Sequence, residues 1–485
     1  MQINTDYINK VNEINKGLNL KYYILTMGCQ LNENDSEKIS GMLSEMNYQE
    51  TLDMDEADLI IFNTCCVREN AEQRLFGKVG EVKKIKEKKN VILAICGCMM
   101  QEKVMVEKIH QSYKYVDIIF GTHTIHQFPE DLYNCLIKKE KISDILDIDG
   151  EVYEGMPIKR NNRYKASVTI MYGCNNFCAF CIVPYVRGRE RSRAPEDIIN
   201  EIEALAKDGY KEVTLLGQNV NSYRGNDKIK NFADLLEEVC KIEGIERIRF
   251  TSPHPKDFTD DVIDVIAKNP KICRIIHMPL QSGNSKVLKE MNRKYTKEQY
   301  LALVDKMKAR IPDVEFSTDI IVGFPGETED EFQDTLDVVE KVNFEQIFMF
   351  IYSPRIGTVA ERREDQVDEN TKHERFTRLQ KLYESKVEQN NEKYIGKVEN
   401  VLIEEYSKTN PNMYSARTGT NKIVVFEPKE NQKIGDIVKV KIISQHKWFL
   451  LRNHPIIFFR QRGRSFLAKN MNKWKSLKIK VYVKY

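Results

Sequence analysis

The sequence predicts an α/β protein in three parts: an N-terminal doubly wound parallel sheet, a central partial (β/α)6 barrel of the TIM type, and a small C-terminal β-barrel. Two observations predict this. From Lys21 to residue 393, short apolar runs alternate with charged segments of helical period. From Tyr394 onward, short β runs follow one another directly. A chain of 485 residues is too long for one ordinary core, so we expect several domains.

Composition limits the class of protein. Hydrophobic residues make up 41% of the chain and charged residues 30%, as in soluble globular proteins. No apolar run approaches the length that spans a bilayer, and the polar N-terminus carries no hydrophobic signal segment. We therefore expect a cytoplasmic protein without membrane contact. Eleven cysteines, an odd number, favour metal ligation in a reducing compartment over a disulfide framework.

The N-terminal sheet is expected over residues 20–146, after a loose polar arm or short helix at 1–19. Its strand candidates are Tyr22–Met27, Asp58–Asn63, Val91–Cys96 and Val116–Phe120. Ligands collect at the carboxyl ends of strands in such sheets. The first three strands are followed there by Cys29, Cys65 and Cys98. Buried packing cysteines are the alternative, and they are our interpretation of Cys66 and Cys96. Cys29, Cys65 and Cys98 each follow the carboxyl end of a strand, and this position favours a metal cluster.

A polar linker at 147–163 precedes the barrel, which is expected over residues 164–390. Its six strand candidates are Ser167–Tyr172, Glu212–Leu216, Arg247–Thr251, Arg274–Met278, Phe316–Val322 and Phe344–Tyr352. The working face of such a barrel is the rim at the strand C-termini. Gln218, Asn219 and Gln281 fall on that rim, where amide side chains can bind the polar edges of a cofactor. The alternative is that these residues only form the turns that any barrel needs between its strands and helices.

Three cysteines with the spacing C-x3-C-x2-C follow the first barrel strand: Cys174, Cys178 and Cys181. Three thiolates on one short loop can hold three corners of an iron–sulfur cluster and leave the fourth iron without a protein ligand. An open metal position suits catalysis. A zinc site would need a fourth ligand nearby, and no His or Cys follows before Cys240. The loop therefore predicts an iron–sulfur cluster with one open iron.

The same loop carries a family resemblance. The spacing, with Phe180 before the last cysteine, resembles the radical S-adenosylmethionine superfamily. The longer phrase GCNNFCAFCIVPYVRGRERSR resembles its methylthiotransferases, most closely the tRNA 2-methylthio-N6-dimethylallyladenosine synthase branch. The resemblance extends over about residues 20–445.

The resemblance implies two 4Fe–4S clusters. One, on Cys174, Cys178 and Cys181, would bind S-adenosylmethionine near Gln218, Asn219 and Gln281 and form a radical. The other, on Cys29, Cys65 and Cys98, would supply sulfur. The implied reaction is methylthiolation of carbon 2 of N6-dimethylallyladenosine beside the tRNA anticodon, by sulfur insertion and then S-methylation.

The implied partners are the tRNA anticodon stem-loop, a reductant such as flavodoxin or ferredoxin, and a sulfur donor, with the enzyme acting as a monomer. Two alternatives stay open. A sister methylthiotransferase would act on threonylcarbamoyladenosine in tRNA or on a ribosomal-protein aspartate. An RNA-binding iron–sulfur electron carrier would perform no catalysis.

Two further features point to RNA. Four arginines alternate after the cysteine loop, and they could bind phosphates, bind a cofactor carboxylate, or form a solvated charged segment: Arg187, Arg189, Arg191 and Arg193. The β module at 391–450 resembles the TRAM domain, an RNA-binding fold. The resemblance ends near Ser444, which puts the last strand of that barrel in doubt. The atypical tail at 451–485 holds ten Lys/Arg and no acidic residue; a basic RNA-binding extension and a replaced terminus are both open.

Overall fold

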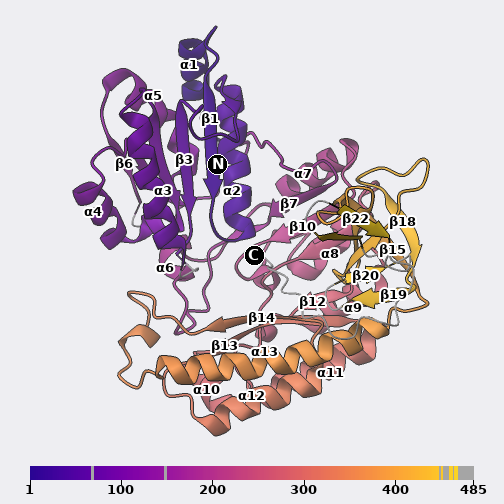
Figure 1. Ribbon diagram of the computed structural model, residues 1–485. Coiled ribbons are helices and arrows are strands. Elements are labelled where there is room, and N and C mark those ends of the chain that lie inside the picture. Colours follow the sequence, from indigo (N-terminus) through magenta and orange to yellow (C-terminus); the bar gives the residue numbers. More distant parts are fainter. Residues whose placement is uncertain (67–69, 147–149, 447–448, 452–457, 462–463, 468–485) are drawn as a thin grey trace. The chain divides into compact units, whose positions relative to one another are not determined.

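The computed structural model describes residues 1–66, 70–146, 150–446, 449–451, 458–461 and 464–467 (Figure 1). The chain divides into two compact units, Met1–Glu384 and Ser385–Tyr485. Within the described part of the chain, no helix combines the length and the apolar character that crossing a bilayer requires.

The first unit begins with a six-stranded parallel sheet in the order β2-β1-β3-β4-β5-β6. The four predicted strands are present, and two short edge strands, β2 and β6, join them. The strands are β1 (Lys21–Thr26), β2 (Gln49–Glu50), β3 (Leu59–Thr64), β4 (Ile92–Gly97), β5 (Ile118–Phe120) and β6 (Ile142–Asp144). The two edge strands are too short to leave a periodic signal in the sequence.

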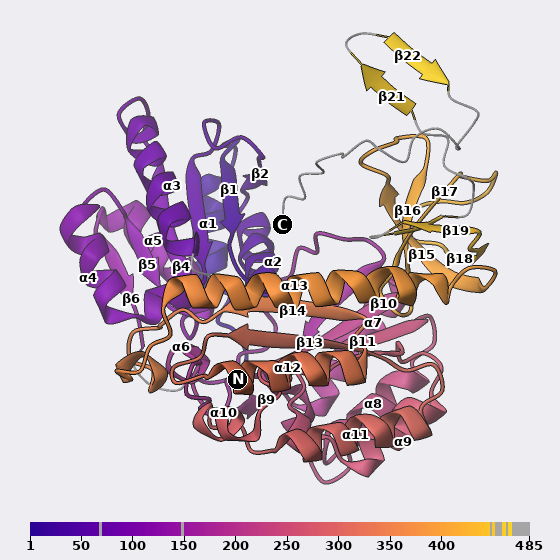
Figure 2. The same ribbon diagram turned by 60° about the horizontal axis from the view of Figure 1, so that its bottom comes forward.

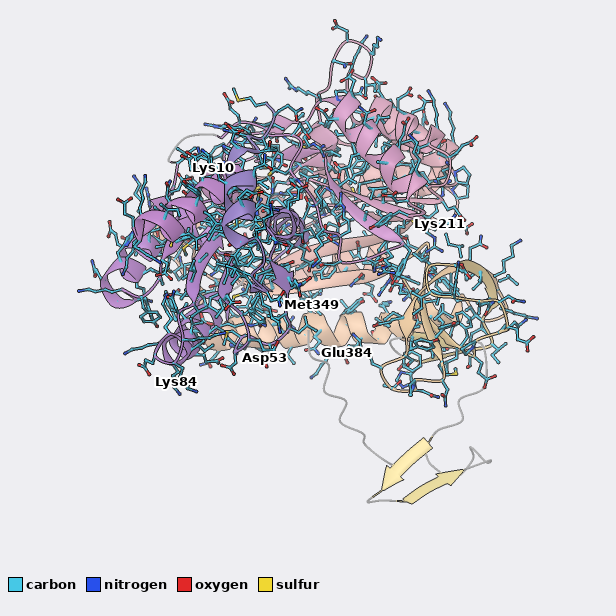
Figure 3. All side chains as sticks on the ribbon, turned by 90° about the horizontal axis from the view of Figure 1, so that it is seen from above. Lys10, Asp53, Lys84, Lys211, Met349 and Glu384 are labelled. Atoms are coloured by element: carbon cyan, nitrogen blue, oxygen red, sulfur yellow. The ribbon has the colours of Figure 1, made fainter. Side chains whose placement is uncertain are left out.

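Helices cover both faces of this sheet, which confirms the doubly wound prediction. One core contains apolar residues of α1 (Asp6–Asn15), α2 (Gln30–Glu45) and α5 (Phe128–Lys138). The core on the other face contains residues of α3 (Asn70–Lys86) and α4 (Lys103–Ser112). Strand residues alternate between the two cores as a strand's period of two requires. Charged side chains such as Lys10 and Lys84 point outward from the helices (Figure 3).

Of the two expectations for residues 1–19, the helix is the one observed. Ile8 and Val11 of α1 are buried in the core of the sheet domain. The N-terminal segment is therefore part of that domain and is not a loose arm.

The barrel consists of two parallel three-stranded sheets, β11-β10-β7 and β12-β13-β14. An isolated parallel bridge between Ile248 and Ile272 links them. Five of the six predicted strands are confirmed with small shifts at their ends, and the first is divided, with its N-terminal part in the barrel. The barrel strands are β7 (Lys165–Thr169), β10 (Glu212–Leu216), β11 (Arg247–Phe250), β12 (Ile275–His277), β13 (Glu315–Val322) and β14 (Gln346–Ile351).

Helices alternate with these strands, and Figure 2 shows α12 running beside β13. They are α7 (Pro195–Lys207), α8 (Phe232–Lys241), α9 (Asp260–Lys268), α10 (Ser285–Glu290), α11 (Lys297–Arg310), α12 (Glu329–Val342) and α13 (Glu369–Glu392). Two of them start with reciprocal capping boxes, at Thr296 and Thr328, which satisfy backbone N–H groups that a helix start leaves open.

The second unit contains a curled sheet in the order β18-β15-β16-β17-β20-β19. Its strands are β15 (Val398–Tyr406), β16 (Tyr414–Thr418), β17 (Ile423–Phe426), β18 (Ile437–Lys441), β19 (Ser444–His446) and β20 (Phe449–Leu451). β20 pairs in parallel with β17, and Leu450 is buried in the core. The sheet thus extends past Ser444. Beyond it, β21 (Phe458–Gln461) and β22 (Arg464–Leu467) form a hairpin, while much of the basic tail lies outside the described residues.

Candidate active site

The three cysteines after β7 lie on a loop whose two ends are fastened together. The expected strand Ser167–Tyr172 is in fact two: β7 ends at Thr169, and β8 (Met171–Tyr172) pairs antiparallel with β9 (Arg191–Ser192). Gly173 follows at φ +74°, and a Cβ there would lie 2.0 Å from the carbonyl oxygen of Arg189. Only glycine fits so close an approach. The loop therefore leaves the barrel and returns to it at one fixed point.

The three thiols of this loop share one neighbourhood. Burial, then the nearby Cys178 and Cys174, raise the pKa of Cys181 to about 12, and burial raises that of Cys174 to about 11. Two N–H groups approach the sulfurs: Asn176 Nδ2 lies 3.4 Å from Cys174 Sγ, and Arg293 Nη1 lies 3.3 Å from Cys178 Sγ. Hydrogen bonds to sulfur of this kind tune iron–sulfur clusters.

Arg293 was not predicted from the sequence. It follows α10, more than a hundred residues after the loop, and its side chain is 8% exposed. Its other partners are Tyr295 Oη at 3.0 Å and the Pro279 carbonyl at 3.2 Å, which accept from Nε and Nη2. Among the described residues, no carboxylate forms an ion pair with it. Its positive charge beside Cys178 is therefore not neutralised by the protein.

The rim around this loop carries buried polar atoms without hydrogen-bond partners in the described structure. They are Asn176 Oδ1, Gln218 Oε1, Asn219 Oδ1 and His254 Nε2. Such atoms cost free energy unless a ligand or water satisfies them. Asn219 also donates to Glu190 and to Asp257, at 3.2 and 2.9 Å. A bound ligand with polar edges, as expected of S-adenosylmethionine, fits this rim.

Gln281, the third predicted cofactor contact, has a left-handed backbone, with φ +69°. Its side chain is buried, and its backbone N–H donates to the carbonyl of Asp319 at 2.8 Å. A non-glycine residue in this conformation is uncommon and is held by its surroundings. The position is thus a fixed turn on the rim.

The second set of cysteines comes together at the carboxyl edge of the N-terminal sheet. Cys29 follows β1 and is exposed, whereas Cys65 and Cys98, after β3 and β4, are buried. A Cβ at Gly28 would lie 2.9 Å from Cys65 Sγ, so the loops after β1 and β3 touch there. The φ of +117° at Gly28 also favours glycine.

Asn32, the fourth residue of the GCQLN motif after Gly28, joins these loops. Its Nδ2 donates to the carbonyls of Met27 and Thr64, at 2.9 and 2.7 Å. Its Oδ1 lies 3.8 Å from Cys29 Sγ and 3.7 Å from Cys98 Sγ. One buried amide thus fixes the strand ends that precede Cys29 and Cys65 and faces two of the three thiols.

Arg187 reaches this second set from the barrel. It ends α6 (Val183–Arg187), a short helix within the loop of the first set, and its side chain is 3% exposed. Its Nε lies 3.2 Å from Cys98 Sγ, and its Nη2 donates to Asn32 Oδ1 and Asp35 Oδ2, both at 2.7 Å. The charge of Arg187 is therefore neutralised by Asp35.

Cys66 is buried next to this site, in an apolar cluster with Cys98, Ile182 and Val186, and its interpretation as a packing residue stays a prediction. A hydrogen bond from Cys66, followed by the charge and hydrogen bond of Arg187, lowers the pKa of Cys98 to about 6 against the opposing effect of burial. Cys96 is buried in the sheet core, as expected of a packing residue.

Both donor sets have the chemistry that iron–sulfur clusters require. Each consists of thiols, and hydrogen-bond donors face the sulfurs. Over the described ranges, no three His, Cys, Asp or Glu side chains are placed to hold one metal ion. A cubane cluster spreads its ligands over several iron atoms.

The four arginines after the cysteine loop have different surroundings. Arg187 and Arg193 are buried in ion pairs, Arg193 with Glu154 and Glu201, both at 2.7 Å. Arg191 is half-buried in β9. Arg189 is exposed and lies over the ring of Phe177. These positions give no support to phosphate binding by Arg187 and Arg193, and they leave Arg189 as the accessible member.

Three family models match the chain. The Radical SAM superfamily matches residues 168–339, Uncharacterized protein family UPF0004 matches residues 21–121, and the TRAM domain matches residues 392–451. The radical SAM match covers both the cysteine loop and Arg293, and the UPF0004 match covers all three cysteines of the second set. The TRAM match ends at β20, so the last strand placed in doubt by the sequence belongs to the domain.

Relatives of known name cover nearly the whole chain. A tRNA-2-methylthio-N(6)-dimethylallyladenosine synthase of Acetivibrio thermocellus is 50% identical over 446 residues, 91% of this chain and 92% of the relative. The enzyme of the same name from Clostridium beijerinckii is 53% identical over 432 residues, 89% and 95% of the two chains.

Among solved structures, a radical S-adenosylmethionine methyltransferase, TsrM, from Kitasatospora setae matches with a TM-score of 0.53 at 14% identity. The match covers 71% of this chain and 77% of TsrM, and it shows a shared fold. Identity of this extent, together with the three matching domains, shows that the chain belongs to the tRNA-2-methylthio-N(6)-dimethylallyladenosine synthase family of radical S-adenosylmethionine enzymes.

Proposed function

We propose that this enzyme attaches a methylthio group to carbon 2 of N6-dimethylallyladenosine next to the anticodon of tRNA. The observation that carries the proposal is the presence of two separate thiol sites in one compact unit, joined by Arg187. The relatives' name states the same reaction. Abstraction of hydrogen from an aromatic carbon needs a radical-forming cofactor, and insertion of sulfur needs a second site.

In this proposal Cys174, Cys178 and Cys181 hold the cluster that binds S-adenosylmethionine. A cluster bound there would supply the electron that cleaves S-adenosylmethionine to methionine and a 5′-deoxyadenosyl radical. Other residues of the chain would position this cluster and shield it from water. Arg293 donates to Cys178, and the β8–β9 pair fixes the loop. The unsatisfied amide oxygens of Gln218 and Asn219 are the groups we assign to cofactor binding, with Gln281 as a fixed turn beside them.

In this proposal Cys29, Cys65 and Cys98 would hold the second cluster, which would supply sulfur. In the net change, a C–H bond of adenine would be replaced by a C–S bond, and the hydrogen would leave in 5′-deoxyadenosine. A second S-adenosylmethionine would give its methyl group to the sulfur and leave as S-adenosylhomocysteine. With sulfur at the oxidation level of sulfide, formation of the C–S bond would return one electron to the second cluster, which equals the electron used for cleavage.

The partners follow from this chemistry. The substrate is a tRNA anticodon stem-loop, whose unpaired bases can be splayed into a pocket. Arg189, on the cysteine loop, and the exposed Tyr406 of the TRAM domain are the residues we assign to RNA contact. Tyr414 is buried in the domain's core. A flavodoxin- or ferredoxin-type reductant and a sulfur donor complete a reaction that we place in the cytoplasm, carried out by a monomer.

The test is nucleoside analysis of bulk tRNA from a strain that lacks the gene. We expect 2-methylthio-N6-dimethylallyladenosine to disappear, its unthiolated precursor to accumulate, and the wild-type gene to restore the product. Unchanged 2-methylthio-N6-dimethylallyladenosine with loss of a threonylcarbamoyl or ribosomal-protein modification would favour a sister enzyme. Failure of the reduced, reconstituted protein to form 5′-deoxyadenosine would favour an electron carrier.

A further inference from the structure

The short helix α6 lies between the two thiol sites. Cys181, of the first site, is six residues before Arg187, which contacts Cys98 of the second site. Five of these residues, Val183–Arg187, are helical, and at 1.5 Å per residue they span only about 7.5 Å. The loop that holds one cluster therefore extends, without a flexible connection, to a ligand of the other.

Packing holds α6 against the sheet domain independently of Arg187. Ile182 and Val186 form an apolar cluster with Cys66 and Cys98. The Val186 carbonyl accepts a hydrogen bond of 2.7 Å from Thr122 Oγ1, in the loop after β5. Removing the guanidinium would therefore leave these contacts in place, so its own effect can be measured.

The guanidinium fits its surroundings closely. The planar guanidinium makes three directed contacts. They join it to Cys98 at 3.2 Å, to Asn32 at 2.7 Å and to Asp35 at 2.7 Å. Asn32 in turn fixes the ends of β1 and β3 through the carbonyls of Met27 and Thr64. Through this amide, the guanidinium reaches all three cysteine-bearing loops.

We propose that Arg187 is a positioning residue that fixes the sulfur-donating cluster at a set separation and orientation from the radical-forming loop. The inference rests on the proposed function, because only sulfur transfer to a carbon radical requires the two sites to be held in register. A misplacement of about 1 Å can cost two orders of magnitude in rate. The N–H···S contact to Cys98 also acts on the cluster itself, because hydrogen bonds to its sulfurs set the reduction potential.

The test compares Arg187→Met with Arg160→Met. Arg160 is a matched control because it is a similarly buried arginine, paired with Glu37 of α2 and with Glu201, and it contacts no thiol in the described structure. The first readout is the reduction potential and electron paramagnetic resonance spectrum of the second cluster alone. It is taken in a chain carrying Cys174→Ala, Cys178→Ala and Cys181→Ala. The second readout, in the otherwise intact enzyme, is methylthio product per 5′-deoxyadenosine.

For Arg187→Met we expect a more negative potential and an altered spectrum, because a donor to the cluster's sulfur is lost. We also expect product per 5′-deoxyadenosine to fall about 10- to 100-fold, the usual effect of outer ligand-shell changes. Arg160→Met should change neither. Arg187→Lys keeps the positive charge but lacks the planar guanidinium. We expect this variant to fold and to give a reduction potential and a product ratio between those of the wild type and Arg187→Met.

An unchanged potential and an unchanged ratio in both Arg187 variants would overturn the proposal. If the wild-type enzyme forms no methylthio product, the proposed function fails. The potential of the second cluster then still decides whether Arg187 acts on it.

Discussion

The two thiol sites differ in how the chain builds them. The first uses three cysteines of one loop, closed by β8 and β9. The second uses three loops at the edge of a six-stranded sheet, joined by Asn32. Each has an arginine from elsewhere in the chain, within 3.3 Å of one sulfur. Arg187 is neutralised by Asp35, whereas the hydrogen bonds of Arg293 in the described structure go to neutral oxygens and to Cys178.

The difference suggests distinct roles for the two arginines. A positive charge that the protein does not neutralise favours the more negative, reduced form of a nearby cluster. In the proposed function, the cluster that delivers an electron would thus be the one beside the charge that the protein does not neutralise. An arginine neutralised by a carboxylate acts mainly through its directed hydrogen bonds and less through its charge. Such an arginine suits a cluster that must be held in a fixed position.

The largest expected effect separates the two sites by their products. Cys174→Ala should abolish both 5′-deoxyadenosine and methylthio product, because no radical forms. Cys98→Ala should keep 5′-deoxyadenosine formation and lower methylthio product by more than about 100-fold, beyond the range of outer-shell changes. Both products are measured by chromatography with mass detection. Equal loss of 5′-deoxyadenosine in the two variants would contradict the division of roles.

The second prediction concerns the free charge of Arg293. Arg293→Met should lower the rate of S-adenosylmethionine cleavage about 10- to 100-fold and make the potential of the first cluster more negative. The measurement uses a chain without Cys29, Cys65 and Cys98, so that only this cluster is present. Arg293→Lys should recover part of the potential because it restores the charge. If the reduction potential of the first cluster is the same in all these variants, the proposed difference between Arg293 and Arg187 is wrong.

The third prediction tests the neutralised arginine through stability. Asp35→Asn leaves Arg187 buried without its carboxylate, and loss of one partner of a buried ion pair costs about 3–5 kcal/mol. The control is Asp260→Asn, which breaks an exposed pair with Lys306 and Arg310 and should change stability far less, because solvent screens this pair. Denaturant unfolding of the metal-free chain measures both. Similar losses of unfolding free energy in the two variants would show that the buried pair of Asp35 and Arg187 stabilises the protein no more than an exposed pair does.

The smallest effect concerns the pH response of the sheet domain. Burial, with Asp144 and Glu130 nearby, raises the pKa of Asp131 from 3.8 to about 8. The unfolded chain then releases this proton at lower pH than the folded chain, so stability falls as the pH rises between these values. Asp131→Asn should remove that loss. Its melting temperature should exceed the wild type's more at pH 8 than at pH 5, by about 2–4 °C for each kcal/mol. An equal difference at both pH values would refute the assignment.

The sequence pointed to the cysteines of both sets, whose role as cluster ligands stays a prediction, but it did not point to their surroundings. The spacing of Cys174, Cys178 and Cys181 is local, and the other trio stood at strand ends, where sheet topology brings residues together. Arg293 could not be found in this way, because its contact with Cys178 depends on the tertiary structure. Arg187 was noticed for its charge and considered for binding of phosphate or of a cofactor carboxylate, because sequence alone does not distinguish a buried ion pair from an accessible arginine.

The separation of the cysteines along the chain has a consequence for how the protein acquires its iron. Cys174 to Cys181 span one short loop, whereas Cys29 to Cys98 enclose a segment about ten times longer, whose closure costs about 2 kcal/mol more in chain entropy. The loop after β7 can capture its cluster as a local event during maturation. The other site exists only once the sheet has assembled and Asn32 has drawn its loops together. Cells short of iron should therefore accumulate chains that carry the first cluster and lack the second.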